Sequence, residues 1–277
     1  MPVITSRDHP LVKQLVRIEG STAYRRKNGL TLIDGIHLIQ IHYSVFGPPR
    51  NLIVSQSYFE DKENKRFLNM LFGNTDPKIT ILDDTLFRFA APVKTPTGVL
   101  ALIDVPETQE SSSSREVFSV LLESIQDPGN LGSILRSAAA ANVRDVYLSK
   151  HCTDAWSPKT LRAAMGAHFF LRIHENSDLI QITGKFPGSV IATSIQATKN
   201  LFETSLSGPT AFAFGNEGSG LSREMIEAAH DNMAIIMPGK TESLNVAAAA
   251  AICFFEKVRQ DKATVTRSVG TKQGAGV

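Results

Sequence analysis

The chain has 277 residues, 42% of them hydrophobic and 20% charged, and its formal net charge is +2. This composition is ordinary for a globular protein; it excludes global disorder and gives no argument for nucleic-acid binding from charge alone. Two cysteines, Cys152 and Cys253, cannot form a disulfide framework, and the seven histidines have no metal-ligand spacing, so we expect no metal.

The first segment, residues 1–106, has the pattern of a small α/β domain. Its apolar residues from Leu11 to Ile18 recur at helical spacing, and strand-like runs follow at Leu52–Ser55 and Ile79–Leu82. Helical stretches separate these runs. The segment is therefore predicted to fold on its own as a small α/β domain.

A basic cluster lies within the first thirty residues of this segment, at Arg25, Arg26 and Lys27. A basic arm of this kind can contact the phosphate backbone of RNA. A solvated helix face has the same composition, so the residues alone leave both interpretations open.

Two segments are predicted to be flexible. Residues 107–116 hold almost no large apolar side chain and include four consecutive serines, Ser111–Ser114, which is typical of a linker. Residues 263–277 lack hydrophobic periodicity and are predicted to form a flexible tail.

Residues 117–262 alternate between strand and helix patterns, which indicates a mostly parallel sheet covered by helices on both faces. The expected strands are Val117–Leu122, Asp145–Leu148, Val190–Ala192, Ala211–Phe214 and Ala234–Met237. The expected helices are Ser133–Asn142, Lys159–Phe169, Ser222–Ala229 and Leu244–Arg259.

Three polar, glycine-bearing segments follow strands of this sheet: Ile125–Ser137, Phe214–Ser222 and Ile235–Ala247. Ligands of parallel sheets bind beyond the carboxyl ends of the strands. The first and third segments also lead into helices, whose N-termini present free backbone N–H groups to a ligand. We therefore interpret the three segments as one site.

Two common nucleotide-binding templates do not fit these segments. The glycines do not match the G-x-G-x-x-G order of a dinucleotide fold. Gly239-Lys240-Thr241 resembles the end of a P-loop, but Ala234 stands where a P-loop requires glycine. A nicotinamide enzyme or an ATPase is therefore a weak hypothesis.

The sequences DPGNLGSILRSA, FGNEGSGLS and ESLNVAAAAAICFFE, in this order, closely resemble motifs 1, 2 and 3 of the SpoU (TrmH) branch of the SPOUT RNA methyltransferases. The resemblance covers about residues 117–259. It departs from the family pattern at Ala164, where serine is common, and at Ile236-Met237-Pro238, where proline usually precedes methionine.

The resemblance implies a fold and a reaction that periodicity does not show. It implies a deep trefoil knot in the C-terminal domain, a homodimer formed through the knot region, and S-adenosylmethionine bound in a bent conformation. The methyl group would be transferred to a ribose 2′-hydroxyl of RNA. The implied cofactor-binding residues are Thr193, Gly215, Asn216, Gly218, Ile235 and Leu244.

The expected catalytic residues are Asn130, Arg136, Glu217, Ser243 and Asn245. Arg136 is assigned first to phosphate positioning and electrostatic stabilisation, because a guanidinium is a poor general base, and a role as the general base is left open. Glu217 is expected to pair with Arg136 or to orient a neighbouring motif. Asn130 is a turn residue that can also cap the next helix, and Ser243 is a candidate N-cap of the last helix, with Asn245 in its second position.

We expect an RNA ribose 2′-O-methyltransferase whose N-terminal domain, through Arg25, Arg26 and Lys27, holds a folded ribosomal RNA. Transfer RNA is the alternative substrate, and a non-catalytic protein that acts by occupying RNA is the alternative function. Residues 1–8 lack the apolar core of a signal peptide, and the longest apolar run, Val246–Phe255, is half of a membrane span. We therefore expect a cytoplasmic protein with no membrane partner.

Overall fold

The computed structural model describes residues 2–73, 75, 77–93, 95–107 and 117–270. Most of the predicted linker, residues 108–116, and the end of the predicted tail, residues 271–277, lie outside the described residues. The chain forms two compact units, the first from Met1–Glu107 with Asp154–Phe169 and the second from Thr108–Thr153 with Phe170–Val277.

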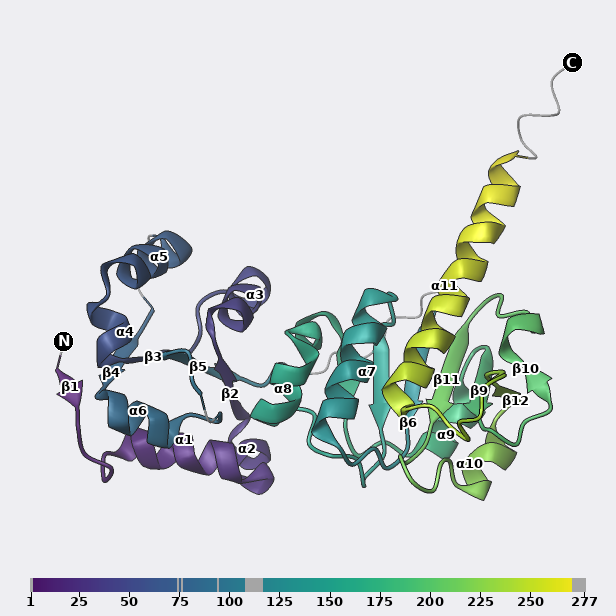
Figure 1. Cartoon of the computed structure of the whole chain (residues 1–277), viewed down its shortest axis with the longest axis horizontal. Helices are drawn as coiled ribbons and strands as arrows, with labels where there is room; N and C mark the ends of the chain where they lie inside the picture. The colour runs from purple at the N-terminus through teal and green to yellow at the C-terminus, as the bar shows by residue number, and fades with distance from the viewer. Residues whose placement is uncertain (1, 74, 76, 94, 108–116, 271–277) are drawn as a thin grey trace, which may run out of the picture. The chain divides into compact units, whose positions relative to one another are not determined.

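A five-stranded sheet of order β1-β4-β3-β5-β2 forms the centre of the first unit (Figure 1). β5 is antiparallel to β2 and β3, whereas β4 pairs in parallel with β1 and β3. The predicted α/β class of this segment is confirmed. The strands are β1 Val3–Ile4, β2 Leu30–Asp34, β3 Asn51–Ser55, β4 Ile79–Leu82 and β5 Val99–Asp104. The helices before the second unit are α1 Pro10–Gly20, α2 Thr22–Asn28, α3 Ile36–Phe46, α4 Gln56–Glu60, α5 Lys62–Phe72 and α6 Asp84–Ala90.

Helix α1 has the amphipathic pattern predicted for it. Val12, Leu15 and Ile18, spaced three residues apart, are fully buried and pack with Phe87 of α6 against the sheet. Burial of a side chain of this size contributes about 1.5–3 kcal/mol. Helices α1 and α6 lie on one face of the sheet and α3 lies on the other (Figure 1).

Residues 154–169 belong to the first unit, although the sequence analysis placed them in the C-terminal domain. They contain α8 Pro158–Ala164 and most of a 3-10 helix, Ala167–Phe170. Thr31 of β2 donates a hydrogen bond of 2.6 Å to the carbonyl oxygen of Trp156, which ties this segment to the sheet of the first unit.

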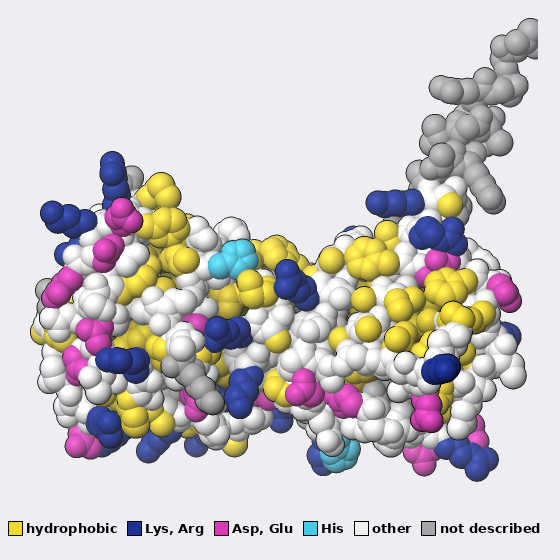
Figure 2. Space-filling model, viewed as in Figure 1, with side chains coloured by type: hydrophobic (Ala, Val, Ile, Leu, Met, Phe, Trp, Pro, Cys, Tyr) yellow, Lys and Arg dark blue, Asp and Glu magenta, His cyan; other side chains and the backbone are white. Residues whose placement is uncertain are grey.

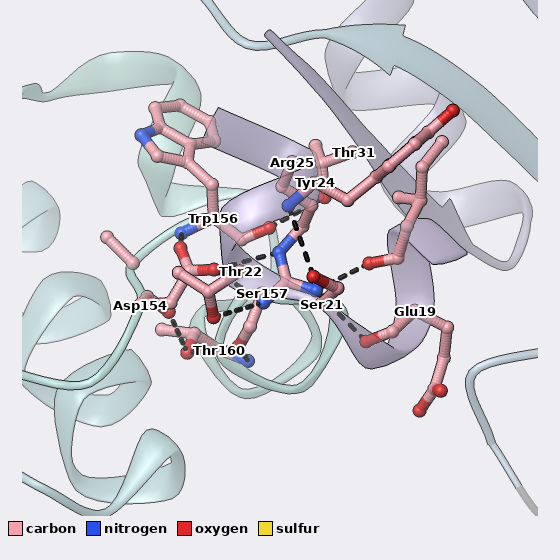
Figure 3. Close-up of polar contacts among 12 residues, drawn as sticks. Glu19, Ser21, Thr22, Tyr24, Arg25, Thr31, Asp154, Trp156, Ser157 and Thr160 are labelled. Carbon is pink, nitrogen blue, oxygen red and sulfur yellow. Dashed lines mark hydrogen bonds and ion pairs between the residues drawn. The ribbon is translucent and has the colours of Figure 1, made fainter. Parts of the chain in front are cut away.

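A buried ion pair fixes the start of the same segment (Figure 3). Arg25 donates through Nε and Nη2 to Oδ2 of Asp154, at 2.8 and 2.5 Å, and both side chains are about 5% exposed. Arg25 also donates to the carbonyl oxygens of Ile18 and Glu19, at 2.5 and 3.0 Å. The backbone N–H of Trp156 donates to the other Asp154 oxygen, Oδ1, at 2.9 Å. Nothing in the local sequence around residue 25 indicates this partner, which lies 129 residues away.

The second unit is built on a seven-stranded, all-parallel sheet of order β10-β12-β9-β11-β6-β7-β8 (Figure 1). The predicted parallel α/β fold is confirmed, while the trefoil knot stays a prediction. The strands are β6 Phe118–Leu122, β7 Asp145–Leu148, β8 Arg172–His174, β9 Ser189–Thr193, β10 Lys199–Asn200, β11 Thr210–Phe214 and β12 Asp231–Ala234. The helices are α7 Pro128–Ala140, α9 Leu179–Lys185, α10 Arg223–Ala228 and α11 Val246–Gly270, with a 3-10 turn at Leu201–Glu203.

Strand β11 shows how helices cover both faces of this sheet. Side chains alternate along a strand. Ala211 and Ala213 pack with residues of α9 and α10, whereas the rings of Phe212 and Phe214 contact Phe254 of α11. Small side chains on one face and aromatic ones on the other let both helical layers pack closely.

Several element boundaries differ from the predicted ones. The helix predicted to reach Phe169 ends at Ala164 and is followed by the 3-10 helix. β12 ends at Ala234, where the predicted strand began, so residues 235–245 form a loop. α7 begins at Pro128 because Asp127 caps it, accepting the N–H of Asn130 at 2.8 Å. α11 continues to Gly270, so the predicted flexible tail is helical over its first eight residues. Once the packed first part of α11 has formed, each further residue adds one backbone hydrogen bond, so the helix can extend beyond the packed region.

Asp145, at the start of β7, is a buried carboxylate of the second unit. Arg172 donates two hydrogen bonds to it at 2.7 and 2.6 Å, and His174 Nε2 lies 3.0 Å away. The ring of Tyr147 stacks on that of His174. Burial acts to raise the pKa of Asp145, but the hydrogen bonds and charges of His174 and Arg172 outweigh it and hold the pKa below its ordinary value.

This pKa predicts how stability depends on pH. A carboxyl whose folded pKa lies below its unfolded one stabilises the fold above about pH 4, and the contribution disappears as the pH falls through the folded pKa. Asp145→Asn is expected to lower the free energy of unfolding by about 1.5–3 kcal/mol at pH 7, and by progressively less below pH 4. Urea denaturation of both proteins across this pH range measures the difference. A difference that stays constant with pH would contradict the assignment.

Among the described residues, no helix has both the length and the apolar character needed to cross a membrane.

Candidate active site

The three predicted site segments begin at the carboxyl ends of β6, β11 and β12, on one edge of the parallel sheet. β6 and β11 are neighbours, although residues 123–209 separate them in the chain. This brings the loop after β6 next to the loop after β11. The fold therefore assembles the site where parallel sheets commonly bind ligands.

Glu217, in the loop after β11, holds the loop after β6. Its Oε2 accepts the backbone N–H of Gln126 at 3.2 Å, and its Oε1 accepts that of Asp127 at 3.0 Å. Oε1 also accepts Nδ2 of Asn130 at 3.1 Å. Glu217 was predicted either to pair with Arg136 or to orient a neighbouring motif. In the structure it contacts the motif 1 loop.

These contacts determine the charge state of Glu217. Partial burial acts to raise its pKa, but the hydrogen bonds from Asn130 and from the amides of Asp127 and Gln126 outweigh it, and the pKa lies below its ordinary value. Glu217 is therefore anionic at neutral pH and is a fixed hydrogen-bond acceptor.

Asn130 connects this pair of loops to the third segment. Its Oδ1 accepts Nδ2 of Asn245 at 2.8 Å, while its own Nδ2 donates to Glu217. Oδ1 of Asn245 accepts the N–H groups of Ala247 and Ala248, at 2.9 and 3.3 Å. Asn245 is thus the N-cap of α11, a role that the sequence analysis gave to Ser243. The three segments form one hydrogen-bonded cluster, as the single-site interpretation predicted.

A small cavity lies beside this cluster in the second unit. It has a volume of about 100 Å³, and its lining includes four of the predicted site residues, Thr193, Ile235, Ser243 and Leu244. The Thr193 hydroxyl donates to the carbonyl oxygen of Ala213 at 2.8 Å, which leaves its lone pairs for a ligand. The cavity walls are mostly apolar.

Three further predicted residues lie in the loop after β11, which carries motif 2. A side chain at Gly215 would meet the backbone of Gly220 and Leu221 at 2.1 Å, so only glycine fits there. Asn216 donates to the carbonyl oxygen of Ser124 at 2.9 Å, and its Oδ1 accepts the N–H of Gly218 at the same distance. Asn216 and Gly218 thus shape the loop that carries Glu217.

Arg136 is exposed on α7 and is not part of the cluster. It lies six residues after Asn130, and at 100° per residue the two side chains leave the helix about 120° apart. Among the described residues, no hydrogen bond or ion pair holds its guanidinium. The predicted pairing of Arg136 with Glu217 is absent, and the guanidinium is open to solvent.

The three predicted RNA-binding residues on α2 differ in exposure. Arg26 and Lys27 are exposed, but Arg25 is buried in its ion pair with Asp154. Its guanidinium is committed within the first unit and does not reach a phosphate backbone. The prediction of an RNA contact therefore remains for Arg26 and Lys27.

Glu123, which follows β6 directly, was not among the predicted site residues. Its carboxylate accepts the N–H and the hydroxyl of Ser222 at 2.7 and 2.8 Å and so holds the start of α10. Ser124, next to it, has a positive φ of 57°. An acidic residue at a strand end was the available signal, but its partner lies 99 residues away.

Comparison with known proteins identifies the family. The SpoU rRNA Methylase family matches residues 117–255, about half of the chain, and the chain belongs to this family, as its three motifs predicted. No group of His, Cys, Asp and Glu side chains in the described part of the chain has the arrangement of a metal site.

The similarity to individual proteins extends over both units. An uncharacterized tRNA/rRNA methyltransferase of Synechocystis sp. is 34% identical, over 95% of this chain and 96% of that protein. The 23S rRNA (guanosine(2553)-2'-O)-methyltransferase RlmP of Bacillus subtilis is 30% identical, over 83% of this chain and 89% of that protein. The crystal structure of an RNA 2'-O ribose methyltransferase matches with a TM-score of 0.79 and 26% identity, over 94% of this chain and 99% of that one.

Proposed function

We propose that this protein transfers a methyl group from S-adenosylmethionine to a ribose 2′-hydroxyl of ribosomal RNA. The observation that carries the proposal is the hydrogen-bonded series Asn245–Asn130–Glu217, which joins the three family motifs in one cluster. Membership of an rRNA methylase family supports the class of reaction, and similarity to a 23S rRNA 2'-O-methyltransferase supports the substrate.

The residues around the small cavity suit this cofactor. Ile235 and Leu244 offer apolar walls to an adenine ring, and Thr193 offers a hydroxyl oxygen. Gly215, Asn216 and Gly218 would hold the cofactor through the backbone of the motif 2 loop. When bound, S-adenosylmethionine supplies an electrophilic methyl group.

The chain's own residues would position the RNA hydroxyl. A ribose hydroxyl is a weak nucleophile, and holding it in line with the methyl group lowers the barrier by several kcal/mol. Glu217 fixes the loop of Asn130. Asn130 and Asn245 present polar groups at the cluster, and Ser243 adds a hydroxyl in the lining of the small cavity. Arg136, exposed and unpaired among the described residues, would contact the phosphate next to the target ribose and stabilise negative charge on its oxygen.

A second copy of the chain would complete the site. A volume of about 100 Å³ is below the 300–1,000 Å³ typical of small-molecule sites, so one chain encloses only part of the cofactor. Exposed apolar side chains, Ile195, Ile236 and Leu244, lie in or beside the same loops. A homodimer formed through this region would cover them. A cytoplasmic location is part of the same proposal.

Glu217→Gln tests the loop connection. The amide cannot accept a hydrogen bond through its nitrogen, so one of the contacts to Gln126 and Asp127 is lost, at a cost of about 1–1.5 kcal/mol. We expect kcat for methyl transfer to fall about tenfold. Glu227→Gln is the matched control, because Glu227 of α10 is exposed and, among the described residues, forms its ion pair with Arg223 at the surface. Equal effects of both substitutions, or none, would contradict the role of Glu217.

Methyl transfer to different RNAs tests the proposed function. The purified chain is incubated with S-adenosylmethionine labelled in the methyl group and with either unmodified ribosomal RNA or unmodified transfer RNA. We expect label in the ribosomal RNA. Label only in transfer RNA would show that transfer RNA, and not ribosomal RNA, is the substrate. RNA binding without label in either RNA would favour a protein that acts by occupying RNA.

A further inference from the structure

A second cavity, of about 580 Å³, lies in the first unit. It lies at the start of β3 and β4, beside the N-terminal turn of α1, and this volume is within the range of small-molecule sites. The polar or aromatic residues that line it are His9, Gln14, Tyr24, Asn51, Lys78 and Thr80. We refer to this cavity as the α1–β3 pocket.

Asn51 is the buried polar group of the pocket. Its side chain belongs to a residue that is only 4% exposed, and its Oδ1 accepts the Thr80 hydroxyl at 3.2 Å. With the oxygen held by Thr80, the amide nitrogen is the free end of this side chain, and no described residue accepts a hydrogen bond from it. The nitrogen is not one of the enclosed polar atoms that lack a partner, so it is accessible from the cavity and can donate to a ligand with a hydrogen-bond acceptor.

A second donor of defined orientation lies at the pocket mouth. Nδ1 of His9 accepts the backbone N–H of Leu11 at 3.2 Å, so the ring proton is on Nε2. Lys78 adds a positive charge at the exposed rim. Tyr24 provides an aromatic wall, and the guanidinium of Arg17 lies 5.9 Å from the centre of its ring.

The charge of the pocket distinguishes it from a cavity of similar size in the same unit. That other cavity, of about 570 Å³, lies at the opposite end of β3 and includes Asp61, Asp84 and Arg88 in its lining. None of the described residues that line the α1–β3 pocket is acidic. A polyanion such as RNA is therefore favoured in the α1–β3 pocket and disfavoured in the acidic one.

The face drawn in Figure 2 carries charges of both signs rather than one extended basic patch. On the side of the molecule shown in Figure 2, Lys and Arg side chains are interspersed with Asp and Glu. Phosphate contacts alone position RNA without reading it, whereas unpaired bases are read in pockets by aromatic rings and hydrogen bonds. The α1–β3 pocket combines the amide of the buried Asn51, an aromatic wall and a lysine at its rim. These groups suit the recognition of an unpaired base.

We propose that the α1–β3 pocket takes one unpaired nucleotide of the RNA substrate. The base lies against Tyr24 with its acceptor atoms toward Asn51 and His9, and the adjacent phosphate lies near Lys78. This inference rests on the proposed function, because RNA is the substrate. It adds the place where the first unit reads that RNA.

The test uses the full chain and an unmodified transcript of 23S ribosomal RNA, in filter binding at several salt concentrations and in methyl transfer. Asn51→Asp keeps the acceptor for Thr80 but replaces the free donor with a carboxylate. We expect it to weaken RNA binding about tenfold and to raise KM with kcat largely retained. Lys78→Gln is expected to weaken binding and to reduce the salt slope by about 0.7.

Asp84→Asn, in the acidic cavity, is the matched control and should change neither KM nor the salt slope. Should Asn51→Asp fail to fold, Lys78→Gln decides the question, since Lys78 is exposed. If the wild type transfers the methyl group and both pocket variants keep its KM and salt slope, the pocket does not bind the RNA. The proposed function would then still stand. A wild type that binds the transcript without methylating it would overturn the proposed function, and the binding data alone would then judge the pocket.

Discussion

Arg136→Ala is expected to lower kcat for methyl transfer about 10²- to 10³-fold and to leave the affinity for S-adenosylmethionine nearly unchanged. The guanidinium is exposed on α7 and is absent from the hydrogen-bonded cluster of the three motifs. Its removal therefore breaks no intramolecular contact among the described residues. The expected size is that of losing one preorganised group that stabilises developing negative charge.

Arg144→Ala is the matched control for Arg136, because Arg144 is also an exposed arginine of the second unit, beyond the end of α7. Single-turnover methyl transfer and calorimetric titration with S-adenosylmethionine measure the two effects separately. Loss of cofactor binding in parallel with activity would show that Arg136 supports the cofactor pocket instead. An equal loss in Arg144→Ala would show a general effect of surface charge on RNA binding.

Asp154→Asn is expected to have the largest effect on stability, about 3–5 kcal/mol of the free energy of unfolding. The substitution keeps the acceptor for the N–H of Trp156 but leaves the buried guanidinium of Arg25 without its counterion. Breaking a buried pair in this way costs far more than the pair itself contributes, because a desolvated charge remains. Urea denaturation followed by the fluorescence of Trp156, the one tryptophan of the chain, reports on this segment directly.

Asp104→Asn is the matched control in the same unit. Asp104 pairs with Arg50 at 2.8 Å, but these side chains are 66% and 57% exposed. An exposed pair of this kind contributes about 0–1 kcal/mol. Similar losses in the two variants would contradict the claim that burial, rather than the charge contact, makes the Arg25–Asp154 pair important.

The features that depend on the pattern of neighbouring residues, namely helices and strands, could be predicted from the sequence. The apolar spacing of α1 and the alternation of strand and helix in residues 117–262 reflect burial of one face or stripe, which is written in neighbouring residues. The three motif segments could be assigned to one site because parallel strands end at a common edge of the sheet.

What the sequence did not predict depends on contacts between distant residues. Arg25 was taken for a surface cation because its partner Asp154 lies in another part of the chain. Glu123 was missed because Ser222 gives no local sign of pairing with it. Asn245, not Ser243, caps α11 because Asn130 holds its side chain from another helix. Each of these contacts exists only after the fold has formed.

The chemical position of the methyl group tests the central claim most directly. Ribosomal RNA methylated by the purified chain with labelled S-adenosylmethionine is hydrolysed in alkali, which needs a free 2′-hydroxyl to cleave the strand. We expect the label to be recovered in an alkali-resistant dinucleotide, because a ribose methyl group blocks cleavage at that nucleotide. Label recovered in mononucleotides would place the methyl group on a base and contradict ribose 2′-O-methylation.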